Sequence, residues 1–456
     1  MIGAVVQDTV PALGLTSTQG LEIPLVARLM GIVGFSVMIG IAVLISANRK
    51  RINWRLVGLG VGVQLLFGGI ILKTSGGRAV FEFAGRIITG LLGFSQAGAR
   101  FVFGNLIDNQ IPVGIPGAGG TIDTSAGYVA QTLSFFAFSV LPTIIFFSSL
   151  MTVLYYLGIM QKVVKGIAWL MQKTLGTSGA ETLSAAGNIF MGQTEAPLLI
   201  KPFVHTMTQS ELTTVMVGGF ATVAGGVLAA YVGLLQGYFP DIASHLLAAS
   251  VMNMPAGIVI SKILMPETEV PETAGTLHMH VEKNETGVID AAASGAGQGL
   301  QLALNVGAML MAFIALVAML DFGLGWVGDL FGQSGWSLQY LLGLALRPLV
   351  WLMGVPWHDA GAVGGLVGVK IGLNEFFAYV QLAGQMAANT LHPRSVVIAT
   401  YALLGFANFS SIAIQIGGIG GLAPKRRGEI ASLGLRAMIG GNLAAFMSAS
   451  LAGMLA

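Results

Sequence analysis

The chain contains no cysteine, which excludes disulfides, thiolate nucleophiles and cysteine metal sites. It is also poor in charge: Asp, Glu, Lys and Arg make up 9% of its 456 residues, whereas soluble domains carry about 25%. A soluble fold of this size needs a charged coat that this chain is unable to make. Because hydrophobic residues make up 54%, we expect the apolar stretches to be solvated by lipid.

Other scarcities narrow the class of function. The formal net charge of +2 is too small to indicate nucleic-acid binding. The six histidines are scattered and form no nucleophile-base pair, so a membrane enzyme is a disfavoured alternative and we expect no organic cofactor. The Gly-rich residues 114–121 lack the Lys-Ser/Thr of a phosphate-binding loop, so we expect an ordinary loop there. No basic segment precedes Pro24, so we expect no cleaved signal peptide.

What the sequence has instead is a series of long apolar stretches. A membrane-spanning helix needs about 20 mostly apolar residues, and Gly, present 65 times, lets such helices approach closely. The stretches are continuous rather than alternating, so spanning strands are disfavoured. We predict an all-α polytopic membrane protein with about eight transmembrane helices, at 25–47, 56–73, 129–160, 212–236, 242–264, 289–320, 395–416 and 430–455.

Basic residues gather in the loops on one side of these predicted spans. Cytoplasmic loops carry an excess of Lys and Arg, and one orientation places every cluster in the cytoplasm. We therefore expect a multi-pass protein of the inner membrane with both termini on the outer, periplasmic side. The clusters are Arg49, Lys50, Arg51 and Arg55; Lys162, Lys165 and Lys173; Lys262; and Lys425, Arg426 and Arg427.

Three stretches between the spans are too polar or too interrupted to cross. Residues 74–128 contain many Gly and several Arg residues, so we expect an amphipathic helix on the outer surface. Residues 161–174 predict a similar helix on the inner surface, and 265–286 predict a polar cytoplasmic loop. His278 and His280 alternate in that loop, which leaves a metal site open as an alternative.

Two further stretches neither span nor leave the membrane. Residues 183–203 read LSAAGNIFMGQTEAPLLIKPF, in which two short apolar runs flank a polar centre at 192–195. Each run is too short to cross, which predicts a re-entrant hairpin with its polar tip near the middle of the bilayer. Residues 340–382 repeat the pattern, with the polar residues of 368–379 around the second tip.

Each hairpin precedes a span whose centre has low helix propensity. Both centres open with Gly-Phe-Ala, at 219–221 and 405–407, and continue with polar or Gly residues. In the predicted topology the first hairpin enters from the cytoplasm and the second from outside, so the two units form an inverted repeat. Inverted repeats with interrupted helices and a site near the midplane are typical of secondary transporters.

Glu195 and Glu375 are the residues whose placement at these tips costs the most free energy, because each carries a carboxylate into the bilayer. An ionised side chain inside the bilayer needs a partner, a cavity or a ligand. One interpretation pairs them with Lys201 and Lys370, respectively. In the other, the carboxylates accept hydrogen bonds from a polar, uncharged substrate. We favour the second, and because no cationic cluster accompanies them, a dianionic phosphorylated substrate is disfavoured.

Neutral polar side chains accompany the two carboxylates and suit sugar hydroxyls and the edge of a heterocycle. They are Gln193, Thr194, Asn408 and Ser411. Phe406 offers a ring face on which a base can stack, with packing or lipid surface as the alternative. Phe409 could also stack on a base, but we favour a role in packing or at the lipid surface for it.

A coupling ion is the second expected ligand. A hard monovalent cation prefers oxygens from carbonyls, amides and hydroxyls, and carbonyls freed at an interrupted helix supply them without added charge. If the first hairpin packs on the first interrupted span, Asn188 and the backbone near Met191 face Thr222 and Val223. Asn188 has an alternative role as a cap of the hairpin helix.

Five stretches are specific enough to compare with known families. The strongest are GQTEAPLLIKPF (192–203), GFANFSSIAIQIGGIGGLAP (405–424) and Gly-x-Lys-x3-Asn-Glu-Phe-Phe-Ala-Tyr (368–379). LMPETE (264–269) and IDAAASGAGQGLQLALNV (289–306) support them. Together, from about residue 25 to the C-terminus, they resemble the concentrative nucleoside transporter family. The resemblance implies a secondary active symporter that imports nucleosides.

The resemblance also implies roles for individual residues. It implies that Gln193, Thr194 and Glu195 meet the nucleobase, that Val227 and Phe406 pack beside the nucleoside, and that Glu375, Asn408 and Ser411 bind the ribose. It places sodium, the coupling ion, at Asn188, Met191, Thr222 and Val223.

The family resemblance further implies an oligomeric state and a division of the chain into two domains. It implies a homotrimer in which an outer transport domain moves against a central scaffold by an elevator-like motion. By this analogy, residues 1–160 and 289–325 form the scaffold, and 161–264 and 326–456 form the transport domain. Residues 265–288 form the cytoplasmic loop between them.

This chain departs from the family pattern at Phe377, where the family often has Val, and we expect that side chain to face away from the chemistry. With eight spans it resembles bacterial members. Gln-Thr-Glu-Ala-Pro at 193–197 resembles the sodium-coupled branch, and the main alternative is a proton-coupled symporter in which Glu195 or Glu375 carries the proton. A channel is disfavoured because no ring of identical pore-lining groups is present.

Overall fold

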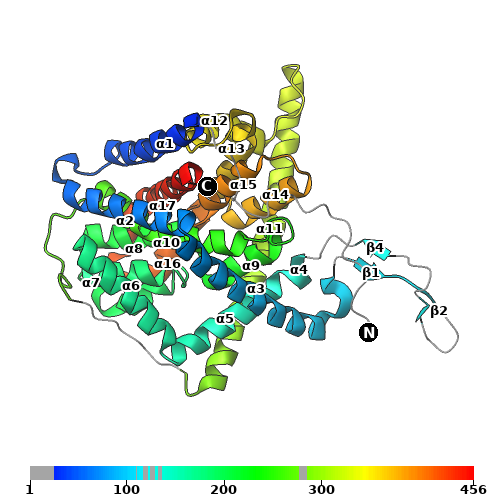
Figure 1. Ribbon diagram of the computed structural model, residues 1–456, viewed down its shortest axis with the longest axis horizontal. Helices are drawn as coiled ribbons and strands as arrows, with labels where there is room; N and C mark the ends of the chain where they lie inside the picture. The colour runs from blue at the N-terminus through cyan, green and yellow to red at the C-terminus, as the bar shows by residue number, and fades with distance from the viewer. Residues whose placement is uncertain are drawn as a thin grey trace.

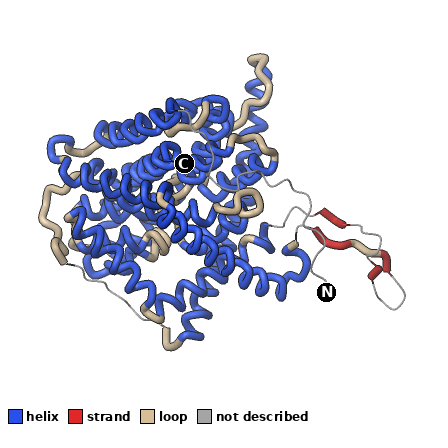
Figure 2. The backbone as a smooth tube through the Cα atoms, viewed as in Figure 1, coloured by secondary structure: helices blue, strands red, loops and turns tan. Residues whose placement is uncertain are grey.

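The structure is a computed structural model in which nearly all of the described chain is helical (Figures 1 and 2). It describes residues 25–108, 110–116, 122–123, 129–131, 136–276 and 285–455. The predicted loop histidines, His278 and His280, lie outside these residues, as do residues 117–121 of the Gly-rich stretch. The predicted fold class, an all-α polytopic membrane protein, is confirmed.

The count of spans differs in detail from the predicted eight. Within the described ranges, seven helices or helix pairs are long and apolar enough to cross a membrane, or eight if one bent pair is counted. Two predicted spans, at 25–47 and 395–416, contain shorter apolar helices. The segment that begins at Ser75 passes the test although it was predicted not to cross.

The N-terminal part of the described chain contains three long helices, and α3 corrects a prediction. They are α1 (Leu25–Leu44), α2 (Trp54–Lys73) and α3 (Ser75–Phe103), with the short turns η1 (Arg49–Arg51) and η2 (Gly104–Ile107). The glycines of α3 do not interrupt it. One of them, Gly85, packs against α10 (Ile242–Leu264), where an added Cβ would lie 2.6 Å from Ser244 Oγ. The location of α3 on the outer surface remains a prediction.

The prediction of a span at 129–160 is wrong at its start. Four short strands, β1 (Gln110–Pro112), β2 (Ile115–Pro116), β3 (Ile122–Asp123) and β4 (Val129–Gln131), pair antiparallel as β1–β4 and β2–β3. The helical part follows as α4 (Phe136–Ser139) and α5 (Leu141–Tyr156). Pro142 lies in the first turn of α5, where its fixed backbone angle favours a helix start.

The first predicted hairpin is present. After α6 (Ile159–Leu175), the chain forms α7 (Gly179–Gly187) and η4 (Ala196–Phe203), joined by the turn that holds residues 188–195. The α6 helix is amphipathic, as predicted: Val164, Ala168, Met171 and Leu175 are buried on one face.

The first interrupted span and its successor follow the hairpin. They are α8 (Gln209–Ala221), α9 (Gly225–Leu235) and α10. The helix stops at Thr222, Val223 and Ala224, which have no regular structure. The predicted interruption is therefore confirmed at the residues where helix propensity was low.

The longest element is α11 (Val288–Leu330), which runs for 43 residues. At about 1.5 Å per residue it is about 65 Å long, roughly twice the hydrocarbon thickness of a bilayer. It packs along α5, and its C-terminal end projects from the bundle at the top of Figure 1.

The second hairpin lies further along the chain than predicted. It consists of α13 (Trp357–Gly372) and α14 (Glu375–Ala387), so it covers 357–387 rather than 340–382. The residues before it form α12 (Leu338–Leu352), which is bent by 117° from α13 and packs along it. Hydropathy alone does not separate α12 from the hairpin, because both are apolar.

The second interrupted span is also confirmed. It consists of α15 (Pro393–Leu403) and α16 (Phe409–Leu422), separated by residues 404–408. The turn η5 (Pro424–Arg426) then leads into α17 (Arg427–Leu455).

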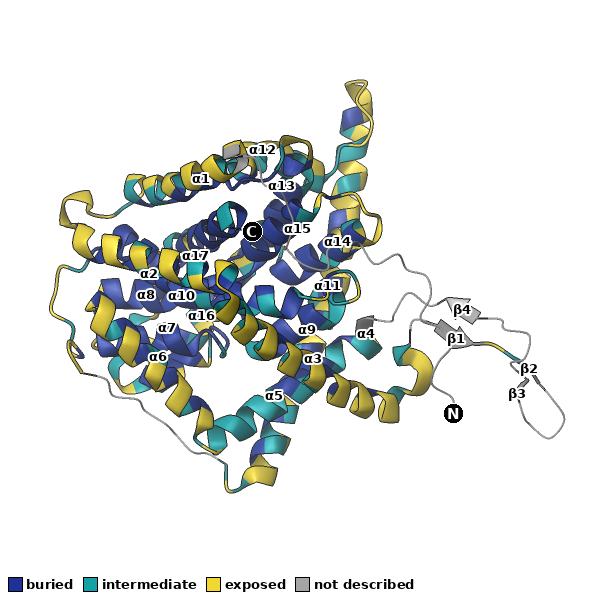
Figure 3. Ribbon diagram, viewed as in Figure 1, coloured by how far each residue is buried: buried dark blue, intermediate teal, exposed yellow. Residues whose placement is uncertain are grey.

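Burial divides the helices into two groups (Figure 3). In the most apolar windows of the α8–α9 pair, α10 and the segment that ends with α17, 83%, 89% and 83% of the residues are buried. The corresponding shares for α2, α3, α5 and α11 are only 33%, 17%, 22% and 22%. The first interrupted span, α10 and α17 therefore lie in a packed interior, and the other group presents apolar side chains outward.

Candidate functional site

The two interrupted helices contact each other at their breaks. The backbone N–H of Phe406 donates to the carbonyl of Thr222 at 3.3 Å. Gly405 has a φ of +113°, and a Cβ there would lie 2.6 Å from the carbonyl oxygen of Phe220. Only glycine fits both the backbone angle and the contact. The breaks thus form a single junction.

A pair of asparagines holds this junction in a repeated manner. Asn253 of α10 donates through Nδ2 to the carbonyl of Ala221 at 2.7 Å. Asn442 of α17 donates through Nδ2 to the carbonyl of Ala407 at 2.9 Å. Each accepting alanine ends a Gly-Phe-Ala triplet, and each asparagine lies on the helix that follows the interrupted span. The internal repeat therefore extends to individual hydrogen bonds.

The tip of the first hairpin is bonded to the second interrupted helix. Gln193 donates through Nε2 to Ser411 Oγ at 3.2 Å, and Gln415 donates to Gln193 Oε1 at 3.1 Å. Gln415 also donates to the carbonyl of Met216 on α8 at 3.0 Å. Gln415 was not predicted as a site residue, although its polar side chain in an apolar helix was a usable signal.

Glu375 opens the second arm of the other hairpin and is oriented from two sides. Tyr231 of α9 donates its hydroxyl to Oε1 at 3.0 Å, and Asn408 donates through Nδ2 to Oε2 at 2.9 Å. The suggested ion pair between Glu375 and Lys370 is not formed, because Lys370 Nζ donates instead to backbone carbonyls of the α15 region. Tyr231 was missed, since it stands in a uniformly apolar stretch.

Glu195 lies at the other tip and faces open space. Its side chain is exposed, and it lines two cavities. Lys201 follows on η4, and its pairing with Glu195 remains a prediction. The two carboxylates therefore have different environments: Glu375 is buried and held by donors, whereas Glu195 borders both cavities.

All eight predicted substrate residues line one cavity of about 140 Å³. They are Gln193, Thr194, Glu195, Val227, Glu375, Phe406, Asn408 and Ser411. Leu302, Val306 and Leu310 of α11 form an apolar wall. Phe409 is not among the lining residues and is 55% exposed, as expected of a surface residue.

A larger cavity of about 290 Å³ lies on the other side of the first hairpin tip. Tyr155 and Gln161 line it, together with Glu195 and Gly192. In the predicted topology, α5 ends and α6 begins on the cytoplasmic side, which would place this cavity between the tip and that side. Glu195 stands where the two cavities meet.

The four predicted sodium residues lie on facing segments next to the junction. Asn188, at the C-terminal end of α7, is fully buried, and neither side-chain atom has a hydrogen-bond partner among the described residues. It faces α8, because a Cβ on Gly218 would lie 3.2 Å from its Nδ2. An orphaned buried amide fits a cation ligand, whereas the alternative capping role would give it a backbone partner.

The remaining predicted sodium residues surround the same turn. Thr222 and Val223 are buried at the break of α8, and Met191 lies in the hairpin turn. Thr222 Oγ1 donates to the carbonyl of Gly218 at 2.8 Å, which leaves its lone pairs available to a cation. The residue types and their burial fit a monovalent ion held by neutral oxygens.

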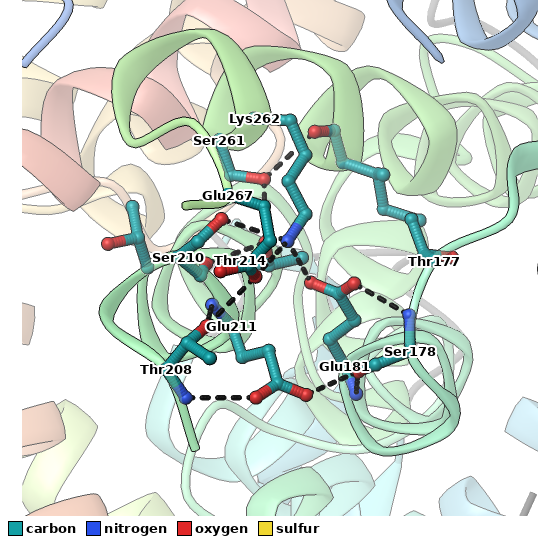
Figure 4. A network of polar contacts seen from close by, with 12 residues as sticks. Thr177, Ser178, Glu181, Thr208, Ser210, Glu211, Thr214, Ser261, Lys262 and Glu267 are labelled. Atoms are coloured by element: carbon teal, nitrogen blue, oxygen red, sulfur yellow. Dashed lines mark hydrogen bonds and ion pairs between the residues drawn. The ribbon is translucent and has the colours of Figure 1, made fainter. Parts of the chain in front are cut away.

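The base of the first hairpin carries a polar network (Figure 4). Two reciprocal capping boxes begin α7 and α8, at Ser178 with Glu181 and at Thr208 with Glu211. They are joined by a hydrogen bond of 2.5 Å from Ser178 Oγ to Glu211 Oε1. The network anchors the hairpin to α8, and the Ser-x-x-Glu and Thr-x-x-Glu spacings would have revealed it.

Lys262 completes the network from α10. Its Nζ lies 2.7 Å from Glu181 Oε2 and 3.4 Å from Glu267 Oε2, and it donates to Ser210 Oγ at 2.9 Å. Glu267 belongs to the LMPETE stretch and also accepts a hydrogen bond from Thr208. This stretch therefore fastens α8, α10 and the hairpin together.

Comparison with known proteins agrees with this geometry. Three family models match the chain: "Na+ dependent nucleoside transporter N-terminus" at 33–106, "Nucleoside recognition" at 137–237 and "Na+ dependent nucleoside transporter C-terminus" at 245–453. An uncharacterized transporter of Haemophilus influenzae is 44% identical over 430 residues, which are 93% of this chain and 97% of that protein. The chain belongs to the concentrative nucleoside transporter family.

This nucleoside transporter is also similar to a relative with a named function and to solved structures. Sodium/nucleoside cotransporter 1 of Mus musculus is 38% identical over 442 residues, 94% of this chain and 64% of that longer protein. A solved structure of CNTnw in an inward-facing substrate-bound state is 42% identical with a TM-score of 0.82, covering 94% of this chain and 98% of that one. A structure of a doubly substituted CNTnw in an outward-facing state is also 42% identical, with a TM-score of 0.83. The match covers 94% of this chain and 98% of that one.

Proposed function

We propose that this nucleoside transporter imports nucleosides across the inner membrane as a secondary active symporter driven by a sodium gradient. The observation that carries the proposal is the 140 Å³ cavity, in which carboxylates, amides and a hydroxyl from both repeats converge on one space. Among the residues that the structure describes, the only charged side chains in its lining are Glu195 and Glu375. They suit the N–H groups and hydroxyls of an uncharged nucleoside and would repel a phosphate.

Within this proposal each part of the cavity has a role. Gln193, Thr194 and Glu195 meet the base, and Val227 and Phe406 pack beside the nucleoside. Glu375, Asn408 and Ser411 bind the ribose. Support for the ribose role comes from the preorganised Glu375 carboxylate, whose two donors keep it in place before the sugar hydroxyls arrive.

Sodium at Asn188, Met191, Thr222 and Val223 couples to substrate through the hairpin tip. Met191 stands immediately before the tip residues that face the base. The carbonyl of Thr222 accepts the N–H of Phe406, so the ion site and the aromatic wall share one connection. An ion that orders this turn raises the affinity for nucleoside, and linkage requires the reverse effect to be equal.

Alternating access in this proposal is an elevator-like movement of a transport domain against a scaffold within a homotrimer. The packed group of helices, with both hairpins, is the transport domain, and the group with outward apolar faces, including α11, is the scaffold. Both termini lie on the outer side of the membrane. The partition by burial supports these assignments.

Uptake by proteoliposomes tests the proposal. Purified protein should accumulate labelled uridine or adenosine above the external concentration when an inward sodium gradient is imposed, and not when choline replaces sodium. Uptake in sodium-free acidic buffer, driven by a pH gradient, would instead establish the proton-coupled alternative. Flux that never exceeds equilibrium under either gradient would contradict secondary active transport.

A further inference from the structure

The two repeats place different side chains at the interrupted end of their first half-helix. In the first repeat, the interrupted end of α8 faces Asn188, a neutral and unpartnered amide. The corresponding half-helix in the second repeat is α15, because Asn253 and Asn442 bind the carbonyls that end the Gly-Phe-Ala triplets at the two breaks. The C-terminal end of a half-helix attracts a cation, since its last carbonyls lack partners. What occupies that end of α15 is therefore informative.

A lysine occupies it. Lys370 of α13 is fully buried, and its Nζ donates to the carbonyl of Ala402 at 2.9 Å and to that of Leu404 at 3.4 Å. The ring of Phe446 closes another side, with its centroid 5.6 Å from Nζ. Within the described residues Lys370 forms no ion pair, so backbone oxygens and a ring face solvate its ammonium. These are the groups that bind a free monovalent cation.

We propose that Lys370 is a tethered cation that takes, in the second repeat, the place that sodium takes in the first. The inference rests on the proposed function, because the first repeat must bind sodium for the comparison to hold. Formal charges support it: within the described part of the chain, Glu195 and Glu375 are the only charged groups that line the substrate cavity. One lysine and one sodium ion balance them. The second repeat then needs no mobile ion.

Removal of the Lys370 ammonium group should create a binding site for a free alkylammonium ion. Lys370→Ala leaves a space that matches n-propylammonium, the part of the side chain that is deleted. We expect uridine uptake by this variant to fall at least tenfold and to recover several-fold with n-propylammonium outside and inside the vesicles. Lys370→Met, which fills the space without charge, should stay inactive. Lys165→Ala, a change at an exposed lysine of α6, should match the wild type with and without the amine.

Binding can be measured without transport. The unfolding temperature of detergent-purified Lys370→Ala should rise with n-propylammonium and not with choline, whereas the wild type should respond to neither. If Lys370→Ala does not fold, Lys370→Gln offers an amide like that of Asn188. Its uptake should depend on sodium with a Hill coefficient near 2, against a value near 1 for the wild type.

Two results would overturn the inference. One is a Lys370→Ala protein that takes up uridine at the wild-type rate with unchanged sodium dependence. The other is a folded Lys370→Ala protein whose uptake and unfolding temperature both ignore n-propylammonium and additional sodium. Failure of the wild type to accumulate nucleoside on a sodium gradient would instead remove the proposed function, and the unfolding measurement would still test the amine site.

Discussion

Glu375 is held in place before any substrate arrives, because a tyrosine from one repeat and an asparagine from the other both donate to it. The same is true of Gln193, which is bonded to Ser411 and Gln415. Hydrogen-bond donors that fix a buried carboxylate reduce the ordering cost of binding. At the residue scale, the site is therefore a preorganised polar surface with one less constrained member, Glu195.

Neutralising Glu375 should weaken nucleoside binding strongly. Hydrogen bonds to a charged group contribute about 1.5–3 kcal/mol, so Glu375→Gln should reduce uptake at subsaturating uridine by about tenfold or more. Tyr231→Phe removes one supporting donor and should have a smaller effect. Glu82→Gln, a change at an exposed carboxylate of α3, is the control. Unchanged uptake by Glu375→Gln would remove that carboxylate from the binding role.

Thr222→Ala should raise the sodium concentration needed for half-maximal uptake, because it removes an oxygen from the proposed ion site. Thr213→Ala is a matched control: Thr213 is buried in α8, the helix that ends just before Thr222, and its hydroxyl also donates to the carbonyl four residues earlier. Sodium titrations of uridine uptake provide the measurement. Equal sodium dependence of the two variants would move the ion site elsewhere.

At the scale of elements, hairpins and breaks follow from local composition. Short apolar runs around Gln193 and Glu195 predict the first hairpin, and residues of low helix propensity predict each break. The positions of the first hairpin and of the two breaks were therefore predictable. The position of the second hairpin was not, because α12 is as apolar as α13 and only the bend near residue 354 separates them. A helix within 74–128 was predicted, but its charged residues and glycines were taken to exclude a span, whereas the segment is long and apolar enough to cross a membrane.

Gly405→Ala tests the junction between the breaks. The substitution forces a Cβ against the Phe220 carbonyl at a backbone angle that alanine avoids. We expect lower thermal stability and loss of uridine uptake. Gly417→Ala is the matched control, since nothing lies within 4 Å of a Cβ there and Gly417 belongs to α16. A stable, active Gly405→Ala protein would show that the junction tolerates separation.

The candidate site was predictable in its polar residues and not in its supports. Gln193, Glu195 and Asn408 stand out because polar groups in apolar segments need a reason. Asn253 and Asn442 carry the same signal, yet their role depends on a carbonyl more than 30 residues away, which no local pattern encodes. Tertiary partners of this kind appear only once the helices are packed.

At the scale of the whole molecule, exposed apolar surface has to be covered by lipid or by another copy of the chain. On α11, Met311, Met319 and Phe322 are 72%, 63% and 83% exposed. The trimer proposal assigns part of this surface to contacts between copies. Native mass spectrometry from a mild detergent should give a species of three times 47.2 kDa. A monomer under conditions that preserve uptake would contradict it.

The charge carried per cycle follows from the tethered cation. If Lys370 balances one carboxylate permanently, one sodium ion enters with each neutral nucleoside, and the ratio of charge to uridine should be near one. Simultaneous measurement of current and labelled uptake in clamped proteoliposomes provides the ratio. In the Lys370→Gln variant the ratio should approach two. A wild-type ratio of two would show that a second mobile ion is needed.

The shared junction of the two breaks limits how this carrier can open. Hydrogen bonds join the two repeats from Phe406 to Thr222, from Gln415 to Met216 and from Tyr231 to Glu375. The repeats are therefore unable to separate around the cavity. A nucleoside bound in the cavity is held by the two joined repeats, which move as one rigid body. The apolar wall formed by α11, rather than the boundary between the repeats, must therefore be what moves relative to the bound nucleoside. A cross-link between the repeats would then leave transport intact, whereas a cross-link to α11 would stop it.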